Sequence, residues 1–343
     1  MVHDCQTDLG CKGITDPHLV REHDMKLGTI RHGGKDTVIG RVDDDNAVAL
    51  APASMNELIA GGDAALDDAA ARIDAAVSGR SQTIDITNAD WLAPNPAPSK
   101  ILGCAVNNNH LNKVAYRPMK SPMFFCKGRS ALTGHNKPIH ILERHGRTIP
   151  EPEPVAVFKS IAKDVSEDSI LDHVFGYTVT NDCTASGIKF GEDAIALNQR
   201  PELIQPYHME WRHRFEDDNY IFFIYHARSK AADTFAAMGP WITTADEIDN
   251  PNELRVRGYI DGDVYADDTT ASYFFSVERV LSEASTWFTI EPGDCIHTGT
   301  AVKGNEQFPR GNLGVDLRQF AVTDVEIDGL CRLSNPIDAE SKD

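Results

Sequence analysis

The sequence lacks any hydrophobic run long enough to cross a membrane, and its first residues do not form an apolar leader. The most apolar stretches, such as Tyr220–Tyr225, are far shorter than the roughly 20 residues that a transmembrane helix needs. The opening segment, MVHDCQTDLG, has neither a basic start nor the apolar centre of a signal peptide. We therefore expect no membrane partner and a cytoplasmic location.

Paired cysteines are also missing. The seven cysteines are an odd number, are scattered along the chain and form no Cys-x-x-Cys motif. Cys5 and Cys11 could pair or bind a metal, but no second pair of ligands accompanies them. This pattern argues against a disulfide framework and against a structural zinc site, and it fits a reducing compartment.

Positive charge is scarce. Lys and Arg total 33 against 52 Asp and Glu, which gives a formal net charge of -19. Sequence-independent binding to nucleic acid relies on cationic side chains that neutralise phosphates, so we expect no nucleic-acid partner. A small anionic substrate would need help from a metal ion or from a few well-placed cations.

The 343 residues allow two domains. Residues 1–24 show no periodicity and form an N-terminal extension. Residues 25–92 alternate short strand and helix patterns and predict a small α+β domain, which the Pro-rich stretch 93–99 separates from the rest. In 100–337 strands mostly follow strands, which predicts an α+β fold that is mainly β, a roll or barrel, followed by a polar tail at 338–343.

Several local patterns predict individual elements. Ser54 begins a capping box before a short helix, and Asp63 is expected to cap a second one. An amphipathic helix is predicted over 277–287. Asp261-Gly262 and Asp328-Gly329 lie between strand-like runs and predict two tight hairpins.

The segment Pro150–Pro154 reads PEPEP. Proline fixes its own φ and keeps the preceding residue out of the helical region, so the chain here is extended. Side chains two apart in an extended chain share a face, which places Glu151 and Glu153 on the same side. Prolines donate no backbone hydrogen bond, so we expect an edge strand or the entrance of a strand rather than a central strand. The two carboxylates suit a divalent cation, although a solvated Pro-Glu linker has the same composition.

A second acidic position follows a strand-like run. Phe175–Gly187 reads FGYTVTNDCTASG and ends its apolar part at Asn181-Asp182. Asp182 either supplies a third oxygen ligand or caps the turn through its own backbone.

The order of these and other segments resembles the fumarylacetoacetate hydrolase family from Lys26 to Ile337. The similarity rests on KLGTIRHGG near the start, SPMFFCKGRSALTG (121–134), EPEPVAVF (151–158), GYTVTNDCTA (176–185), KAADTFAAMGP (230–240), EPGDCIHTGT (291–300) and DVEIDGLCRLSNPI (324–337). It implies the family's mixed β-roll or barrel catalytic domain and suggests a homodimer.

The resemblance also implies roles for individual residues. The family's metal strands match Glu151, Glu153 and Asp182, which would bind one Mg²⁺ or Mn²⁺ per subunit. Family lysines match Lys127 and Lys230, and residues that contact the substrate match Thr234 and Thr300. The metal would act as a Lewis acid on an enolate.

The sequence departs from the family pattern near two of these positions. Many family hydrolases have a His and a Glu three residues apart that activate water. Here His110 is present as a candidate base, but Lys113 replaces the acid. The family's substrate-contacting arginine is missing after Asp182, and the unusual insertion 188–228 offers Arg212 or Arg214 as replacements, unless it is only a surface excursion.

One stretch resembles a particular subgroup. Residues 133–158 are similar to the 2-keto-3-deoxy sugar-acid dehydratases of the family, and His135 within them is expected near the substrate. We therefore expect a metal-dependent enzyme that acts on a small 2-oxo or 1,3-dioxo acid through a metal-bound enolate. Hydrolysis of a C–C bond in an acylpyruvate-like diketo acid comes first. A lyase is the alternative (a dehydratase of a sugar acid, or a decarboxylase or isomerase), and a non-catalytic acid-binding relative comes third.

Overall fold

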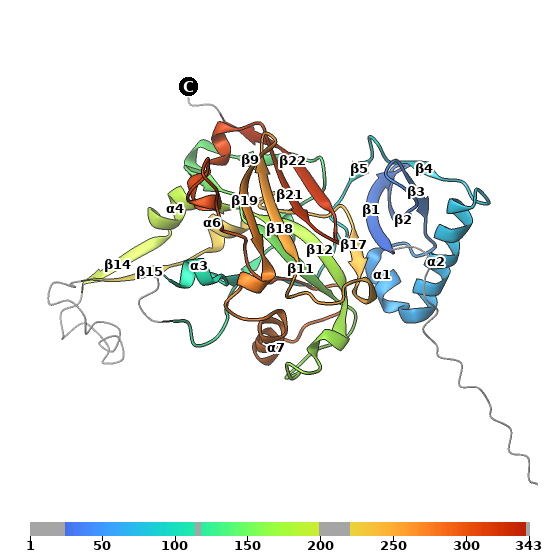
Figure 1. Ribbon diagram of the computed structural model, residues 1–343, viewed down its shortest axis with the longest axis horizontal. Coiled ribbons are helices and arrows are strands. Elements are labelled where there is room, and N and C mark those ends of the chain that lie inside the picture. The colour runs from blue at the N-terminus through green and yellow to red at the C-terminus, as the bar shows by residue number, and fades with distance from the viewer. Residues whose placement is uncertain (1–24, 114–117, 199–219, 341–343) are drawn as a thin grey trace, which may run out of the picture.

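A large mixed sheet forms the centre of the protein in the computed structural model, which describes residues 25–113, 118–198 and 220–340 (Figure 1). Thirteen strands belong to this sheet, and ten of them follow the order β4-β3-β2-β1-β17-β12-β11-β20-β6-β7. In chain order the ten are β1 (Lys26–His32), β2 (Lys35–Arg41), β3 (Asn46–Ala49), β4 (Ile84–Asp85), β6 (Ile101–Ala105), β7 (Met123–Lys127), β11 (Pro152–Phe158), β12 (Val174–Asp182), β17 (Ile242–Thr244) and β20 (Cys295–His297). The others are β5 (Asp90–Trp91), β8 (Leu132–Thr133) and β16 (Ala236–Met238).

A second sheet of five strands packs against the central part of the large one. Its order is β19-β18-β21-β22-β9. The strands are β9 (Ile139–Ile141), β18 (Arg255–Ile260), β19 (Asp263–Thr269), β21 (Val322–Ile327) and β22 (Arg332–Ala339). Ala156 and Val179 of the large sheet share one buried cluster with Val256 and Val325 of the small one. This apolar layer is the main core, and it covers one face of β11 and β12.

Two small pairs of strands and six helices complete the described part. The strand pairs are β10 (Thr148–Ile149) with β13 (Thr184–Ala185), and β14 (Ala194–Asn198) with β15 (Tyr220–Ile224). The helices are α1 (Met55–Ala60), α2 (Gly62–Val77), α3 (Asn109–Asn112), α4 (Ser186–Phe190), α6 (Ala227–Ala231) and α7 (Val277–Trp287). Among the residues described, no helix is both long and apolar enough to span a bilayer.

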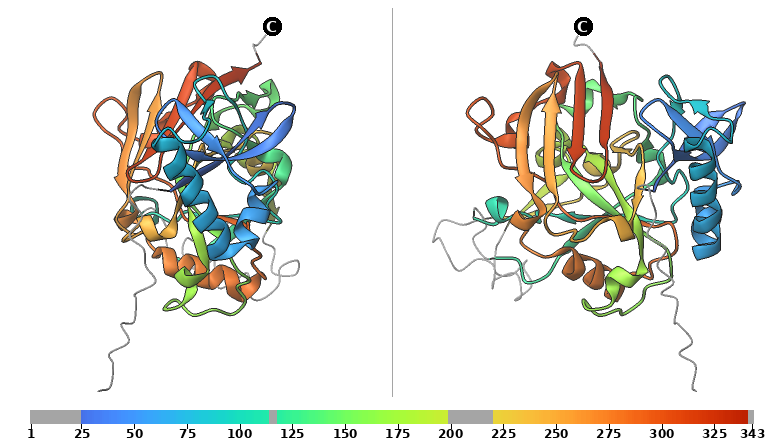
Figure 2. Two further views of the ribbon diagram at one scale, coloured as in Figure 1. Left: turned by 90° about the vertical axis from the view of Figure 1, so that its right-hand side faces the viewer. Right: turned by 45° about the vertical axis from the view of Figure 1, so that its right-hand side comes forward.

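The N-terminal unit is continuous with the large sheet. Strand β1 pairs with β17, where Leu27 lies opposite Ile242. Helix α2 lies against β2 and β3 at one side of the molecule (Figure 2). Leu27 and Ile242 also belong to one buried cluster with Ile59 of α1 and Val155 of β11. The predicted boundary at 93–99 thus separates two segments that share a sheet and a core.

Most of the predicted local elements are confirmed. Helix α7 spans the predicted residues, and both predicted turns join antiparallel strands, β18–β19 and β21–β22. The side chain of Ser54 caps α1 by accepting a hydrogen bond from the backbone of Glu57. The prediction for Asp63 is wrong, because α2 already begins at Gly62 and has no side-chain cap.

The PEPEP segment lies at the entrance of a strand that is central further along. Strand β11 pairs with β12 on one side and with β20 on the other. The carbonyls of Pro152 and Pro154 accept hydrogen bonds from the backbone N–H groups of Ala301 and Thr298. On this side of β11 the neighbouring N–H groups donate to the proline carbonyls. The N–H groups that the prolines lack are therefore not needed here. The entrance alternative is confirmed, because Pro152 begins β11. The edge-strand alternative is wrong, and so is the expectation that the segment avoids a central strand, since Pro152 and Pro154 belong to a strand with neighbours on both sides.

Candidate active site

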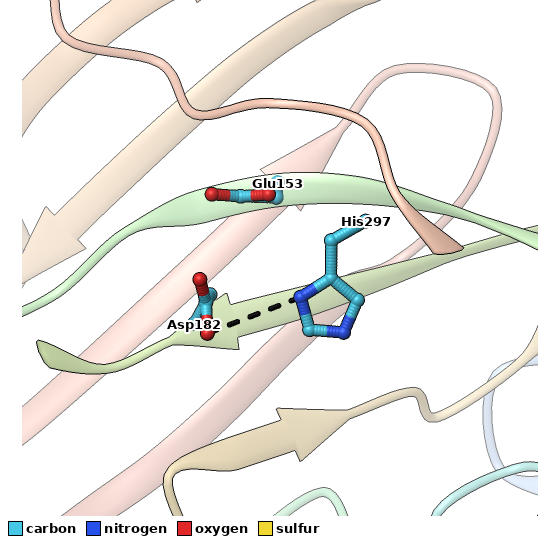
Figure 3. Close-up of side chains that lie close together, drawn as sticks. All are labelled: Glu153, Asp182 and His297. Carbon is cyan, nitrogen blue, oxygen red and sulfur yellow. Dashed lines mark ion pairs between the residues drawn. The ribbon is translucent and has the colours of Figure 1, made fainter. Parts of the chain in front are cut away.

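Strand register brings three ligating side chains to one face of the large sheet. Residues directly opposite each other in a sheet, and residues two apart in one strand, point to the same face. Glu153 lies opposite Thr180, two residues before Asp182, and Val155 lies opposite His297. Glu153, Asp182 and His297 therefore come from three adjacent strands, on the face opposite the main core (Figure 3).

These three residues form a compact and buried cluster. Each offers one ligand atom, and the three atoms lie within 4.8 Å of one another. Nδ1 of His297 lies 3.9 Å from Oδ1 of Asp182, too far for a hydrogen bond. Oε2 of Glu153 and both ring nitrogens of His297 have no hydrogen-bond partner among the described residues. Buried polar atoms without partners are rare and call for an explanation.

Two buried lysines flank Asp182. Nζ of Lys230 lies 2.6 Å from Oδ2 of Asp182 and 2.7 Å from Oε2 of Glu151, and thus joins the two carboxylates. Lys127 forms an ion pair with Oδ1 of Asp182 and donates a hydrogen bond of 2.6 Å to the carbonyl of Phe235. The ring of Phe125 lies 4.5 Å from Nζ of Lys230 and covers it on another side.

The same register explains why the ring of Phe125 and the side chain of Lys127 both reach the site. Gly103 in β6 lies opposite His297 of β20 and opposite Phe125 of β7. A Cβ at Gly103 would lie 2.2 Å from the Phe125 ring, so only glycine leaves room for this ring. Lys127, two residues beyond Phe125, projects to the same face.

Burial and charge shift the pKa values of these groups in different directions. Burial, together with Asp182 and Glu151, raises the pKa of Glu153 well above its ordinary value. Burial lowers the pKa of Lys127, and the neighbouring Lys230 adds to this effect. Although burial alone would lower it, Asp182 and Glu151 raise the pKa of Lys230. The site thus holds one lysine that stays charged and one that loses its proton more readily, the arrangement typical of acid–base sites.

The donor set fits a divalent cation. If Glu151, Glu153 and Asp182 are all ionised and both lysines are charged, the site carries one net negative charge. A bound divalent cation would compensate that charge and would favour the ionised form of Glu153. Oε2 of Glu153 and Nδ1 of His297, which have no hydrogen-bond partner among the described residues, would be available to such an ion. A metal ion could therefore be held here.

Glu151 lies beside this cluster. Besides Lys230, its carboxylate accepts a hydrogen bond of 2.8 Å from the hydroxyl of Thr184. Its backbone carbonyl accepts a hydrogen bond from the N–H of Asp182, which fixes the two acidic residues to each other. Its role as a metal ligand stays a prediction.

The loop that carries His110 is anchored by two buried asparagines. Asn107 donates a hydrogen bond of 2.7 Å to the carbonyl of Thr298. Asn108 donates to Asp268 and to the carbonyl of Thr300, and its side-chain oxygen caps α3 by accepting from the N–H of His110. These bonds tie the candidate base to the segment that follows β20. His110 itself is exposed, and within the described residues its ring forms no hydrogen bond with a carboxylate.

The close approach of this loop depends on Gly299. Its φ is +139°, and a Cβ there would lie 2.7 Å from the carbonyl oxygen of Asn107. Thr300 next to it is buried. The T-G-T stretch therefore holds the predicted substrate-contacting Thr300 beside the loop of His110.

Other predicted residues have contacts of their own or lie outside the described ranges. The ring of His135 accepts a hydrogen bond from the N–H of Ser334 and contacts Trp91 edge-on. The hydroxyl of Thr234 accepts a hydrogen bond from the N–H of His140. Arg212 and Arg214 lie outside the described residues. For none of these four does the structure test the predicted substrate contact.

The roles of His297 and of the asparagines that anchor α3 were not predicted from the sequence. His297 is the last residue of β20, just before the T-G-T turn, and a histidine in such a buried strand was the available signal. The sequence could not predict that His297 lies near Glu153, because the two positions are far apart in the chain.

Comparison with known proteins identifies related chains. A family model for the C-terminal part of fumarylacetoacetate hydrolase matches residues 100–338. An oxaloacetate tautomerase from Xenopus laevis, named as mitochondrial, is 28% identical over 287 residues, which cover 83% of this chain and 79% of the relative. A bifunctional isomerase/decarboxylase of 4-hydroxyphenylacetate degradation from Salmonella dublin is 28% identical over 86% of this chain and 58% of its own.

Solved structures share the fold over most of the chain. A maleylpyruvate hydrolase from Sphingobium, in complex with manganese(II) and pyruvate, superimposes with a TM-score of 0.65 at 22% identity. The match covers 92% of this chain and all of the hydrolase. At this identity the similarity demonstrates the fold, a mixed α/β architecture with more strand than helix.

Proposed function

This chain belongs to the fumarylacetoacetate hydrolase family, and we propose that it is a divalent-metal-dependent enzyme that acts on a small 2-oxo or 1,3-dioxo acid. The observation that carries the proposal is the buried cluster of Glu153, Asp182 and His297 with Lys127 and Lys230 beside it. Burial of so many charged groups costs free energy, and clusters of this kind are typical of functional sites.

The chain's own residues would divide the work. Glu153 and Asp182, with Glu151 beside them, would hold Mg²⁺ or Mn²⁺, which supplies a Lewis acid for the negative charge that develops on the substrate oxygen. Lys230 keeps its charge and orients Asp182 and Glu151. Lys127, whose pKa burial lowers, is a candidate to exchange a proton with the carbon next to the substrate carbonyl.

We place hydrolysis of a C–C bond in an acylpyruvate-like acid first, as the sequence resemblance implies. His110 would act as the base for water, and Asn108 holds it near the T-G-T segment. The pyruvate bound in the Sphingobium maleylpyruvate hydrolase supports a 2-oxo acid as the substrate class.

A second outcome, without addition of water, is favoured by one observation. No carboxylate among the described residues is hydrogen-bonded to the ring of His110, and Lys113 stands where the family hydrolases have an acid. A histidine without an orienting carboxylate is a weaker base for water. Isomerisation moves a proton between carbon and oxygen, decarboxylation breaks a C–C bond and releases CO₂, and dehydration of a 2-keto-3-deoxy sugar acid breaks a C–O bond and releases water. None of the three needs an activated water molecule as the nucleophile. The tautomerase and isomerase/decarboxylase names of two relatives are in line with this alternative.

A substrate panel tests the proposal. The full-length protein is depleted of metal, reloaded with Mg²⁺ or Mn²⁺, and incubated with acylpyruvates, oxaloacetate and 2-keto-3-deoxy sugar acids. Mass spectrometry of the products separates water addition from water loss, and NMR detects tautomerisation. We expect turnover of at least one class, its loss in excess chelator, and its recovery with added metal.

The variant Glu153→Gln tests the proposed metal ligand directly. It keeps the size of the side chain and should weaken binding of the divalent ion while the protein remains folded, because it removes one of several like charges and opens no cavity. Full turnover in excess chelator would refute the metal-dependent function. A folded protein that turns over none of the acids in either metal would favour the non-catalytic alternative.

Location and assembly remain proposals. Cys104, Cys126, Cys183, Cys295 and Cys331 are free thiols, which is compatible with a reducing compartment such as the cytoplasm. We also propose a homodimer, as the family resemblance suggests. Size-exclusion chromatography with light scattering would test the assembly.

A further inference from the structure

The imidazole of His297 has an environment that an ordinary core histidine does not have. It is fully buried, and neither ring nitrogen has a hydrogen-bond partner in the described part of the chain. Burial of a polar group without a partner costs free energy, so a histidine retained for structure alone is normally hydrogen-bonded. His297 therefore requires a partner that the described side chains do not supply.

The direction of the ring indicates the partner of Nδ1, whereas the other ring nitrogen points away from the carboxylates (Figure 3). Nδ1 points toward Asp182, at 3.9 Å from Oδ1, and lies in the same compact group as a carboxylate oxygen of Glu153 (Figure 3). Nδ1 is thus near two carboxylates, yet hydrogen-bonded to neither. An imidazole nitrogen and carboxylate oxygens that surround one point are a metal-ligand set.

The backbone holds this direction rigidly. Strand β20 lies between β11 and β6, and pairs with β11 at Val155 and with β6 at Gly103. Because both neighbours fix the register of β20, His297 cannot turn to the other face of the sheet. The ligand is therefore held in place before any ion binds, which favours tight binding.

We propose that His297 is a nitrogen ligand of the metal ion, and that it makes the site prefer a first-row transition ion such as Mn²⁺ over Mg²⁺. The inference rests on the proposed function, because it assumes that Glu153 and Asp182 bind a divalent ion. Mg²⁺ prefers oxygen ligands and retains its waters, whereas transition ions gain strongly from imidazole. A site built only from carboxylates would lack this discrimination.

The first measurement detects the metal–nitrogen bond directly. Full-length protein is depleted of metal, loaded with less than one equivalent of Mn²⁺, and studied by pulsed electron paramagnetic resonance. We expect modulation from a directly coordinated ¹⁴N nucleus, and its loss in His297→Gln. The variant Ile296→Val is the matched control, since Ile296 lies on the same strand but faces the main core, and it should keep the signal.

The second measurement compares affinities. Calorimetric titration with Mn²⁺ and with Mg²⁺ should show that His297→Gln weakens Mn²⁺ binding by at least about tenfold and changes Mg²⁺ binding much less. Circular dichroism verifies that the variant is folded. If Gln fails to fold, His297→Asn is used in its place, and the ¹⁴N signal of the unaltered protein remains decisive in itself.

Each outcome has one meaning. Mn²⁺ that binds to the unaltered protein without ¹⁴N modulation would overturn the inference and leave the proposed function intact. Equal losses of Mn²⁺ and Mg²⁺ affinity in His297→Gln would overturn the selectivity. A protein that binds neither ion would overturn both the inference and the metal-dependent function.

Discussion

The ammonium group of Lys230 lies 2.6 Å from a carboxylate oxygen of Asp182, and the side chains of both residues are buried. Lys230 comes from the short helix α6, and Asp182 ends strand β12. Their contact joins two segments that are 48 residues apart and places a permanent positive charge at the centre of the site. Because Glu151 binds the same ammonium group, one lysine positions two of the three predicted metal ligands.

Replacement of Lys230 by methionine is expected to destabilise the protein. The substitution leaves Glu151 and part of Asp182 without a counter-charge, and breaking a buried ion pair from one side costs about 3–5 kcal/mol. Chemical denaturation measures the loss in the free energy of unfolding. The control is Lys137→Met, which removes an ion pair with Asp90 at the surface and should cost no more than about 1 kcal/mol. Equal effects of the two substitutions would contradict a structural role for Lys230.

Asn108→Ala is expected to impair catalysis through the position of His110. It removes the cap of α3 and two further hydrogen bonds, to Asp268 and Thr300. We expect kcat to fall by roughly tenfold because the base is displaced, and KM to rise as well because the backbone of Thr300 loses its hydrogen bond. Asn109→Ala serves as the comparison, since its side chain makes one bond, to the carbonyl of Tyr273. If both variants lower kcat equally, the Asn108 network has no special role.

His110→Ala tests the base itself. His110 is exposed, so the substitution should leave the stability nearly unchanged. On either proposed outcome kcat should fall by about 100-fold, the scale of a lost general base. Steady-state kinetics with the best substrate of the panel measures it. Unaltered kcat would move the role of base to Lys127.

The variant Lys113→Glu distinguishes the two proposed outcomes. It restores the acid three residues after His110, the spacing of the family hydrolases. If the enzyme is a hydrolase, C–C hydrolysis should increase. If the reaction involves no water, the native turnover should stay the same or fall. Product analysis by mass decides between them.

The stability of the protein is expected to depend on pH through His135. Burial lowers the pKa of His135 to about 4, and its ring accepts a hydrogen bond from Ser334, which requires the neutral form. Between pH 4 and the ordinary value near 6.5, the unfolded chain binds a proton here and the folded chain does not, so this contribution to stability rises with pH and is complete above about 6.5. His135→Gln should reduce the slope in this window. Denaturation curves at several pH values measure it, with His32→Gln, at an exposed ring, as the control. An unchanged slope would contradict the assignment.

The sequence determined much of the local structure. Ser54, the turn at Asp261-Gly262 and the helix 277–287 form as predicted, because caps, tight turns and amphipathic periods depend on residues close in the chain. The alternation of PEPEP predicts Glu151 and Glu153 on one side by the same kind of local argument, and this stays a prediction. The order of motifs identified the family, which the match over residues 100–338 confirms.

Only the tertiary structure decided which strands are neighbours. Alternation fixes the face of each residue within its own strand, but not the strand that lies beside it. Strand β11 is central because β12 and β20 pair with its two sides, and Val155 and His297 meet over 142 positions of the chain through that pairing alone. His297 therefore joins Glu153 and Asp182 only in the folded protein, where long-range register, and no local pattern, brings the three side chains together.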